Sequence, residues 1–520
     1  MARSVWLHLT KLNASGVALG ASAATRLAEI SNTHPQWQLA ANERDEFSHW
    51  MSGTGDPDYE DSRDVDIAPR KRQELVQWLK KPIPRQRPFY KDTWREVCRK
   101  HMLNSLCALS DLVAGNGVWS AERWREALQA WSGERIVRRS WRYAAPLVQT
   151  MPDAVLQEID HAVTWWVKAA SKSIDSHEDI LLNLCRRVLA LPLEAGSESR
   201  IIRNGVETYD PVGSAINHPI GYITQALINF WLKQNPNDND LLPADLKPIF
   251  TKLCDAQTDR FRHGRVLLGS RLIAFFRVDR PWTEQYLLPL FDWSNPVEAK
   301  AAWEGFLWSP RLYQPLLAAF KSQFLDSANH YADLGEHRQQ FATFLTYAAL
   351  SPTEGYTVEE FRSAIGSLPQ EGLEKSAQAL SQAVEGAADQ RENYWKNRAQ
   401  PFWQHIWPKS RDLATRRIAE SLTRTVIAAR GEFPAALAAV QDWLQPIEQP
   451  HYVVHLLHES GLCGRYPADA LSLLNAVVAD QQWAPRELGQ CLDQIVQAAP
   501  NLAQDARYLR LPEYFRRRGM

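Results

Sequence analysis

The sequence predicts an all-α protein, either an irregular α-solenoid of HEAT-like helix pairs or a set of stacked helical bundles, with little or no sheet. Apolar residues recur at helical spacing along most of the 520 residues, and the connections between these stretches are short and rich in Pro, Gly, Asn and Asp. Runs of alternating Val, Ile and Thr, which would indicate strands, are nearly absent. The 21 tryptophans fit this class, because large rings fill the space between packed helices.

Each predicted helix carries an apolar face. In the segment 120–131, Ser120 stands at an N-cap position, and Trp124, Leu128 and Trp131 follow at helical spacing. The segment 153–170 has an equivalent stripe made of Val155, Ile159, Val163 and Trp166. The same pattern predicts helices over 283–291, 298–308, 312–325, 336–350, 357–366, 410–430, 433–444, 467–480 and 484–498.

Three predicted helices end alike, in a Trp-Leu step followed by a proline: 76–82, 229–236 and 441–446. We interpret each as a last turn that buries an indole against its neighbour and cannot continue past the proline. The three segments are unevenly spaced, so they fit an irregular solenoid, and a cluster of compact bundles fits nearly as well.

The chain is longer than one ordinary core, so two or three domains or one continuous array are expected. A Gly/Ser/Asn-rich stretch marks the first boundary, and a Ser-Pro-Thr-Glu-Gly run near 351–356 marks a second. The predicted parts are an N-terminal helical region 1–195, a linker-like loop 196–216, a middle helical region 217–350 and a C-terminal helical region 351–520.

Charge and cysteine usage indicate a cytoplasmic protein. The net charge of −1 gives no overall attraction to nucleic acid or membrane. Six cysteines without a CxxC pair indicate free thiols in a reducing compartment. No run approaches the roughly 18–20 apolar residues that span a bilayer, so no membrane partner is expected.

Opposite charges lie next to each other near the N-terminus. An acidic loop over 43–66 precedes a basic segment over 70–101, in which Trp78, Phe89, Tyr90 and Trp94 are interleaved. Basic groups with aromatic rings can bind a polyanion such as a nucleic acid. The candidates are Arg70, Lys71, Arg72, Lys80, Lys81, Arg85 and Arg87. We favour the alternative that this segment packs on the acidic loop or forms a solvated helix face, so nucleic acid is not expected as a partner.

A histidine pattern is the sharpest candidate for a metal site. His451, His455 and His458 fall on one face of a helix, and Glu459 or Cys463 could supply a further ligand or base. A metal-dependent enzyme is therefore a second alternative. The favoured interpretation is a polar or packing face, because the pattern does not match the HExxH or metzincin-type arrangements, and no bound metal is expected.

Sequence motifs of catalysis or cofactor binding are absent from the chain: GxxxxGK(S/T), GxGxxG after a strand, GxSxG and a sirtuin-like Gly-Ala-Gly-x-Ser loop. The run Asn237-Asp-Asn-Asp240 lacks the glycine and glutamate of a calcium loop and is expected to cap the next helix. The sequence therefore predicts no catalytic residue and no cofactor for this chain.

Several patches of the sequence resemble an uncharacterised helical region of bacterial proteins, most specifically over 217–500. The patches are Asn217-His-Pro-Ile-Gly221, Leu241-Leu-Pro-Ala-Asp245, Arg260-Phe-Arg-His-Gly-Arg-Val-Leu-Leu-Gly269, Trp303-Glu-Gly-Phe-Leu-Trp308, Phe402-Trp-Gln-His-Ile-Trp-Pro-Lys-Ser-Arg411 and His451-Tyr-Val-Val-His-Leu-Leu-His-Glu-Ser-Gly461. That region resembles the C-terminal part of long defence-associated proteins whose N-terminal part is a sirtuin-type NAD-consuming domain.

The resemblance implies a division of labour. A sirtuin-type domain would hydrolyse NAD, and the helical region would restrain it until a phage protein binds, as in abortive infection. This chain lacks the catalytic loop, and its start resembles a cut edge. We therefore expect a non-enzymatic sensor half or a separately encoded partner, whose partners are a sirtuin-type NADase domain in cis or trans, a phage protein as trigger, and possible further copies of itself. NAD would belong to the associated domain.

Overall fold

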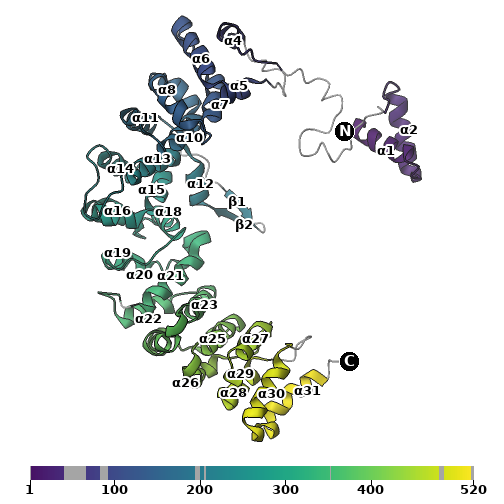
Figure 1. The fold of residues 1–520 in the computed structure, drawn as a ribbon, viewed down its shortest axis with the longest axis vertical. Helices are drawn as coiled ribbons and strands as arrows, with labels where there is room; N and C mark the ends of the chain where they lie inside the picture. The colour runs from purple at the N-terminus through teal and green to yellow at the C-terminus, as the bar shows by residue number, and fades with distance from the viewer. Residues whose placement is uncertain are drawn as a thin grey trace. The chain divides into compact units, whose positions relative to one another are not determined.

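The computed structural model describes residues 2–39, 66–81, 92–193, 200–203, 206–351, 353–478 and 485–516, and it is all-α (Figure 1). Helix accounts for 74% of the structure, which confirms the predicted class. Among the described residues the strands are β1 (Arg200–Arg203) and β2 (Val206–Tyr209), which pair antiparallel as one hairpin. The chain divides into two compact units, Met1–Trp166 and Val167–Met520.

The first unit contains short helices. Its helices are α1 (Ala2–Ala14), α2 (Ala21–Thr33), α4 (Arg72–Leu79), α5 (Trp94–Lys100), α6 (Met102–Asn116), α7 (Ala121–Trp131), α8 (Val137–Val148), α9 (Asp153–Glu158) and the start of α10 (Asp160–Ser171). Trp124, Leu128 and Trp131 of α7 are all buried, as predicted. Ser120 takes the N-cap position of α7, although its side chain makes no capping hydrogen bond.

Hydrogen bonds donated by indole N–H groups connect these helices. Nε1 of Trp131 donates to the carbonyl of Cys98 at 3.1 Å, and Nε1 of Trp166 donates to Oγ of Ser140 at 2.9 Å. The rings of Trp141 and Trp166 lie 4.8 Å apart. A buried indole therefore contributes apolar area and also satisfies its own polar atom.

The second unit continues with α10 and holds the remaining helices. They are α11 (Glu178–Ala190), α12 (Pro211–Asn217), α13 (Pro219–Lys233), α14 (Lys247–Leu253), α15 (Arg262–Gly269), α16 (Leu272–Val278), α17 (Arg280–Trp282), α18 (Pro296–Leu307), α19 (Gln314–Ala319), α20 (Lys321–Asp326), α21 (Arg338–Leu350), α22 (Val358–Gly366), α23 (Gln370–Gly386), α24 (Arg391–Tyr394), α25 (Arg416–Ala428), α26 (Phe433–Val440), α27 (His451–Glu459), α28 (Leu462–Arg465), α29 (Pro467–Val477), α30 (Leu488–Ala498) and α31 (Ala506–Arg516).

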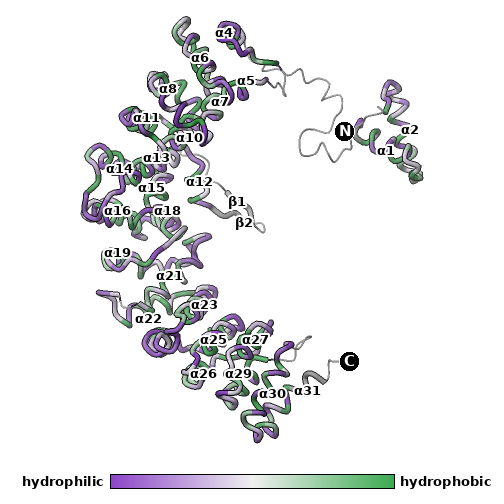
Figure 2. The backbone as a smooth tube through the Cα atoms, viewed as in Figure 1, coloured by the Kyte–Doolittle hydropathy of each residue, from purple (hydrophilic) through white to green (hydrophobic). Residues whose placement is uncertain are grey.

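Within the second unit, helices pack on near neighbours in the chain. Helix α15 packs on α18, α18 on the 3-10 segment η5 (Tyr331–His337), η5 on α21, α21 on α23, and α23 on α25. Helix α25 then contacts α26 and α27, and α27 contacts α30. This order of contacts is that of a stack of helix pairs, in which each pair covers the apolar face of the next. Figure 2 shows polar and apolar residues interleaved along the helices of this unit.

Aromatic rings fill the middle of this stack. Trp303 of α18 is fully buried and stacks on Phe320 at 5.5 Å between ring centroids. Phe291, Phe306 and Phe341 also lie against the Trp303 ring, within 5.0–6.1 Å of it. Trp308, one residue past the end of α18, is 49% exposed. Most of the described tryptophans are buried. In the patch 303–308, however, Trp303 is buried and Trp308 is half exposed.

Several predicted helices are interrupted. The segment 153–170 forms α9 and α10, because Ile159 leaves the helical conformation and Asp160 starts a new helix. The segment 283–291 is a π-helix, Thr283–Leu287, followed by a 3-10 turn, Leu288–Phe291, which carries Pro289 near its start. The segment 312–325 splits into α19 and α20 at Phe320. Periodicity predicted the apolar faces, and local backbone breaks decided the lengths.

The predicted parts and the observed units are divided differently. The boundary between the two compact units falls inside α10, at 166–167. The stretch 196–216, expected to be a linker-like loop, contains β1, β2 and most of α12. All six cysteines are free thiols. In the part of the chain that the structure describes, no helix has the length and apolar character needed to cross a membrane.

Candidate functional site

Two of the sequence patches that carry the resemblance, 260–269 and 303–308, meet at the contact between α15 and α18. A Cβ added to Gly305 of α18 would lie 2.0 Å from the carbonyl oxygen of Val266, and one added to Gly269 of α15 would lie 2.9 Å from that of Ala302. Backbones this close leave no space for any side chain, so the glycines set the distance between the helices. The patches 260–269 and 303–308 therefore form one packed centre in the second unit.

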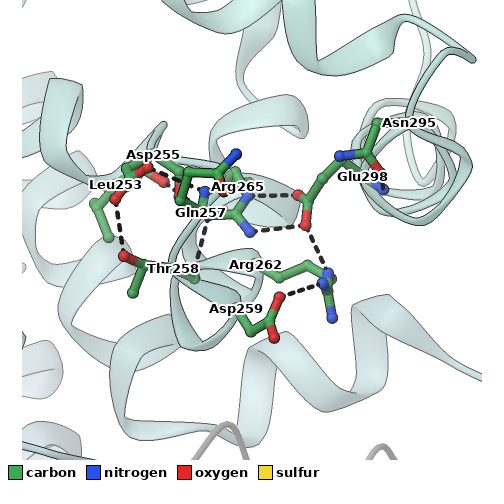
Figure 3. A network of polar contacts seen from close by, with 9 residues as sticks. All are labelled: Leu253, Asp255, Gln257, Thr258, Asp259, Arg262, Arg265, Asn295 and Glu298. Atoms are coloured by element: carbon green, nitrogen blue, oxygen red, sulfur yellow. Dashed lines mark hydrogen bonds and ion pairs between the residues drawn. The ribbon is translucent and has the colours of Figure 1, made fainter.

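A buried ion pair lies beside this contact (Figure 3). The guanidinium of Arg265 donates from Nε to Oε2 of Glu298 at 2.5 Å and from Nη2 to Oε1 at 2.8 Å. The side chains of Arg265 and Glu298 are 1% and 4% exposed. Arg262, one turn before on the same helix, donates to the same carboxylate at 2.8 Å. Two arginines of α15 thus share one carboxylate of α18.

The Nη1 group of Arg265 is also hydrogen-bonded. It donates to the backbone carbonyl of Asp255 at 2.7 Å and to that of Thr258 at 3.2 Å. Glu298 stands in the first turn of α18, where the helix dipole favours a negative charge, and Asn295 caps that turn. Because each of the three guanidinium nitrogens of Arg265 has an acceptor, this network fixes the turn at 255–258 and the start of α18 on α15.

A second buried carboxylate of α18 faces a histidine. Nδ1 of His337 contacts Oε2 of Glu304, and the two side chains are 15% and 1% exposed. Burial acts to lower the pKa of His337, but the hydrogen bond and charge of Glu304 outweigh it, so the pKa is raised. Oε1 of Glu304 is buried with no hydrogen bond to a described residue, and it lies against Gly335, whose φ is +62°. The raised pKa of His337 predicts that this pair contributes to stability in a pH-dependent way.

The patches at 217–221 and 241–245 have capping and anchoring roles. His218 caps α13 by accepting the N–H of Ile220 on Nδ1 at 3.1 Å, and its ring stacks on His263 of α15 at 3.9 Å. Leu242 donates its backbone N–H to Asp279 at 3.1 Å, and Lys247 donates to the same carboxylate at 2.9 Å. Burial acts to raise the pKa of Asp279, but these hydrogen bonds outweigh it and lower the pKa.

The prediction that the run 237–240 caps the next helix is wrong. Oδ2 of Asp240 accepts the backbone N–H of Asn237 at 2.7 Å, which closes a turn within the run itself. The next helix, α14, begins later, at Lys247. The short polar side chain therefore stabilises its own turn rather than the following helix.

The basic segment 70–101 is partly neutralised by acids. Arg72 forms a bidentate ion pair with Asp111 of α6, with N–O distances of 2.5 and 2.7 Å. The ammonium of Lys71 lies 3.4 Å from the carboxylate of Glu74, and that of Lys100 lies 2.5 Å from Glu96. Arg70, Lys80 and Lys81 are exposed. Arg85 and Arg87 lie outside the described residues, as does the acidic loop 43–66 except for Asp66.

Asp66 and Trp78 link the end of the acidic loop to α4. Oδ1 of Asp66 accepts Nε1–H of Trp78 at 2.9 Å, and the buried Arg123 of α7 lies over the Trp78 ring at 4.3 Å. Arg123 also pairs with the buried Asp92 at 2.6 Å. The aromatic and basic character of this region is thus used partly for packing within the first unit.

The three histidines occur on α27, as predicted, but without a ligand cluster. His451 and His455 are exposed, and His455 lies 3.7 Å from Glu487. His458 is partly buried, and its Nδ1 lies 3.3 Å from Glu459. Cys463 is buried. No group of three or more candidate metal ligands occurs among the described residues.

Five residues of this centre were not predicted from the sequence: Arg262, Arg265, Glu298, Glu304 and His337. The available signal was a charge inside an apolar stripe: Arg265 sits between Gly264 and Val266, and Glu304 follows Trp303. A pattern of this kind indicates a charge on a buried helix face, but its partner lies 33 residues away in both pairs and is identified only by the fold.

Comparison with known proteins yields a distant relative. No family model matches the chain, and no solved structure matches it. The uncharacterized protein y4cA of Sinorhizobium fredii (strain NBRC 101917 / NGR234) is 24% identical to it over 543 aligned positions. The alignment covers 98% of this chain and 42% of the relative. The chain thus spans less than half the length of the protein it resembles.

Proposed function

We propose that this chain is a helical sensor and regulatory region of a bacterial anti-phage defence system. In this proposal it binds a sirtuin-type NAD-consuming domain, in cis or in trans, restrains it, and releases it when a phage protein binds. The site of chemistry then belongs to the partner, and this chain acts through protein–protein contacts.

The observation that supports the proposal is the stacking of helices in the second unit. Helices that each pack on a neighbour in the chain expose one continuous row of helix faces, which suits the binding of a long partner surface. Large exposed side chains are available on that unit, among them Trp308 at 49% and Tyr452 at 51% exposure. The few residues that dominate affinity in protein interfaces are enriched in Trp, Tyr and Arg.

The length of the relative also fits the proposal. The alignable region of y4cA is 42% of that protein, so more than half of its chain lies outside the region shared with this helical module. A regulatory module joined to, or encoded beside, a separate domain would give this arrangement.

The proposal is tested by capture from phage-infected cells. The tagged chain is used as bait at low and at high salt, and pure chain is tested for binding to DNA and RNA. A phage protein recovered at both salt concentrations supports the proposal. Tight nucleic-acid binding that falls steeply with salt, and that is lost when Lys80, Lys81, Arg85 and Arg87 are neutralised, would overturn it in favour of a nucleic-acid scaffold.

NAD consumption gives an independent readout. The pure chain should consume no NAD, whereas co-expression with the sirtuin-type domain and the trigger should deplete cellular NAD. Trp308→Ala should weaken capture of the partner at least about tenfold if this residue is an interface anchor. Turnover of NAD by the pure chain that a point substitution in it abolishes would contradict the proposed division of labour.

A further inference from the structure

A small cavity in the C-terminal half of the second unit is lined by three arginines. The cavity has a volume of about 250 Å³ and lies where α24, α25, α27 and the end of α23 meet the short segment η10 (Arg430–Glu432). Arg391, Arg424 and Arg430 line it together with Glu385, Tyr452 and Glu459. All of these residues lie within one compact unit.

Arg424 forms a fixed wall of the cavity. It donates from Nε and Nη2 to the two carboxylate oxygens of Glu385 at 2.9 and 2.7 Å. Its guanidinium also lies 5.5 Å from the centre of the Tyr452 ring. This pairing cancels the charge of Glu385, so the carboxylate does not oppose a second anion nearby.

Arg391 and Arg430 retain open donors. Nε of Arg391 donates to the backbone carbonyl of Glu385 at 3.1 Å, and its two terminal amino groups have no partner among the described residues. The Arg430 side chain has no hydrogen-bond or ion-pair partner among the described residues. A guanidinium carries five N–H donors in a planar fork that matches the oxygens of a phosphate. Two such forks on one cavity form a strong anion-binding arrangement.

The backbone at Arg430 is held in an unusual conformation. Its φ is +53°, in the left-handed region that a non-glycine residue rarely adopts. The next residue is fixed on both sides: the N–H of Gly431 donates to Glu392 at 2.8 Å, and its carbonyl accepts the hydroxyl of Tyr466 at 3.0 Å. Such backbone strain clusters at ligand sites, and here it holds the arginine at the cavity.

The cavity also has an apolar side. Ile427 and Ala428 of α25 and Leu456 of α27 line it, next to the half-exposed ring of Tyr452. Tyr452, Leu456 and Glu459 follow the same i, i+4, i+7 spacing as the histidines of α27, shifted by one residue. The cavity is therefore reached by a different face of this helix from the one that the histidines mark.

We propose that this cavity binds a small phosphate-bearing molecule. Its phosphate pairs with Arg391 and Arg430, and an attached ring packs on Tyr452 and the apolar side. The volume fits a ligand smaller than a typical drug molecule. Glu459 also lines the cavity, and its side chain is 63% exposed, so its carboxylate opposes the anion. The site does not depend on the proposed function.

The test is calorimetric titration of the full chain in phosphate-free buffer with three probes: inorganic phosphate, adenosine 5′-monophosphate and adenosine. We expect one-to-one binding of the monophosphate and no saturable binding of adenosine. If inorganic phosphate binds as tightly as the monophosphate, the phosphate alone carries recognition. Arg391→Gln and Arg430→Gln should each weaken binding about tenfold, because each removes a charge-assisted contact.

Two further variants make the test specific. Glu459→Gln should tighten binding several-fold, because it removes an opposing charge. Arg417→Gln is the matched control: Arg417 also lies on α25, is 80% exposed, does not line the cavity, and should leave binding unchanged. The melting temperature without ligand checks that each variant is folded. The proposal is overturned if no phosphate probe saturates, or if the Arg391/Arg430 double variant binds like the unchanged chain.

Discussion

At the residue scale, the second unit contains full charges where apolar side chains would be expected. Arg265 and Glu298 are both almost fully buried, and each supplies hydrogen bonds that the other needs. Removing a charge from water is costly, and the cost is met only when the geometry satisfies every donor and acceptor. Removing either residue alone therefore leaves the other charge buried without its partner, which destabilises the fold.

Arg265→Met should lower the free energy of unfolding by about 3–5 kcal/mol, because it leaves Glu298 buried and reduces its contacts to Arg262. The double variant Arg265→Met/Glu298→Leu should recover most of this loss, since neither charge then remains. Denaturant unfolding measures both. The exposed pair Arg411–Asp442 is the control, and an Arg411→Met loss as large as that of Arg265→Met would contradict the role of burial.

The His337–Glu304 pair should make stability depend on pH. The folded-state pKa of His337 is raised, so its stabilising contribution is complete below the unfolded pKa of about 6.5 and is lost as pH rises through the folded value. The difference in unfolding free energy between the unchanged chain and His337→Gln should thus be larger at about pH 5.5 than at about pH 9. Denaturant unfolding at both pH values measures it, and a difference that grows with pH would contradict the assignment.

At the element scale, glycines and tryptophans determine how helices pack. A glycine on α18 lets the backbone of α15 approach, while a tryptophan on the same helix fills the space on another side. Gly305 and Trp303 are two residues apart, so they point to different sides of α18 and serve different neighbours.

Gly305→Ala should destabilise the chain by about 1–3 kcal/mol or more, because the new Cβ would overlap the carbonyl of Val266 and push α15 away. Gly489→Ala is the control: Gly489 lies in α30, and nothing is within 4 Å of the Cβ that it would gain. That change should be neutral or stabilise by up to about 1 kcal/mol. Thermal unfolding of the two variants compares them, and equal effects would refute the close-approach argument.

Trp303→Ala should cost about 3–5 kcal/mol, since it empties a fully buried site between α18 and its aromatic neighbours and removes a hydrogen bond to the carbonyl of Phe291. Trp308→Ala should change stability little, because nearly half of that side chain is in solvent. Chemical denaturation followed by circular dichroism measures both. Similar losses for the two variants would show that the exposed indole also carries packing.

At the scale of the whole molecule, each helix of the second unit is stabilised by its contacts with neighbouring helices in the stack. Each layer contacts its neighbours, from α15 through α21 to α30, so the layers in the middle are covered on both sides. In arrays of this kind, stability is a sum over layers and the contacts between them, and the ends open first.

Amide hydrogen exchange should therefore be slowest in α18, α21, α23 and α25 and faster in α30 and α31. In Trp303→Ala, protection should fall most in α18 and η5, which pack on each other, and least in α30. Exchange followed by mass spectrometry resolves the segments. An equal loss of protection in every helix would indicate one cooperative core instead of a stack.

Residue spacing along the chain was enough to predict the class of the fold and the apolar faces of many helices. The spacing of Trp124, Leu128 and Trp131 was sufficient to predict one buried stripe, because residues at i, i+4 and i+7 share a face of any helix. The same rule grouped His451, His455 and His458 on α27. Periodicity is a local property, so it holds whatever the tertiary structure is.

Residue spacing did not predict which helix faces pack against each other; the folded chain shows these contacts. It paired Arg265 with Glu298 and His337 with Glu304, each across 33 residues, and it left two of the three α27 histidines exposed while Tyr452 lines a cavity with three arginines. A charge pattern along the chain carries no information on such partners. Burial makes an unpaired charge costly, but the fold alone brings the compensating group within hydrogen-bonding distance.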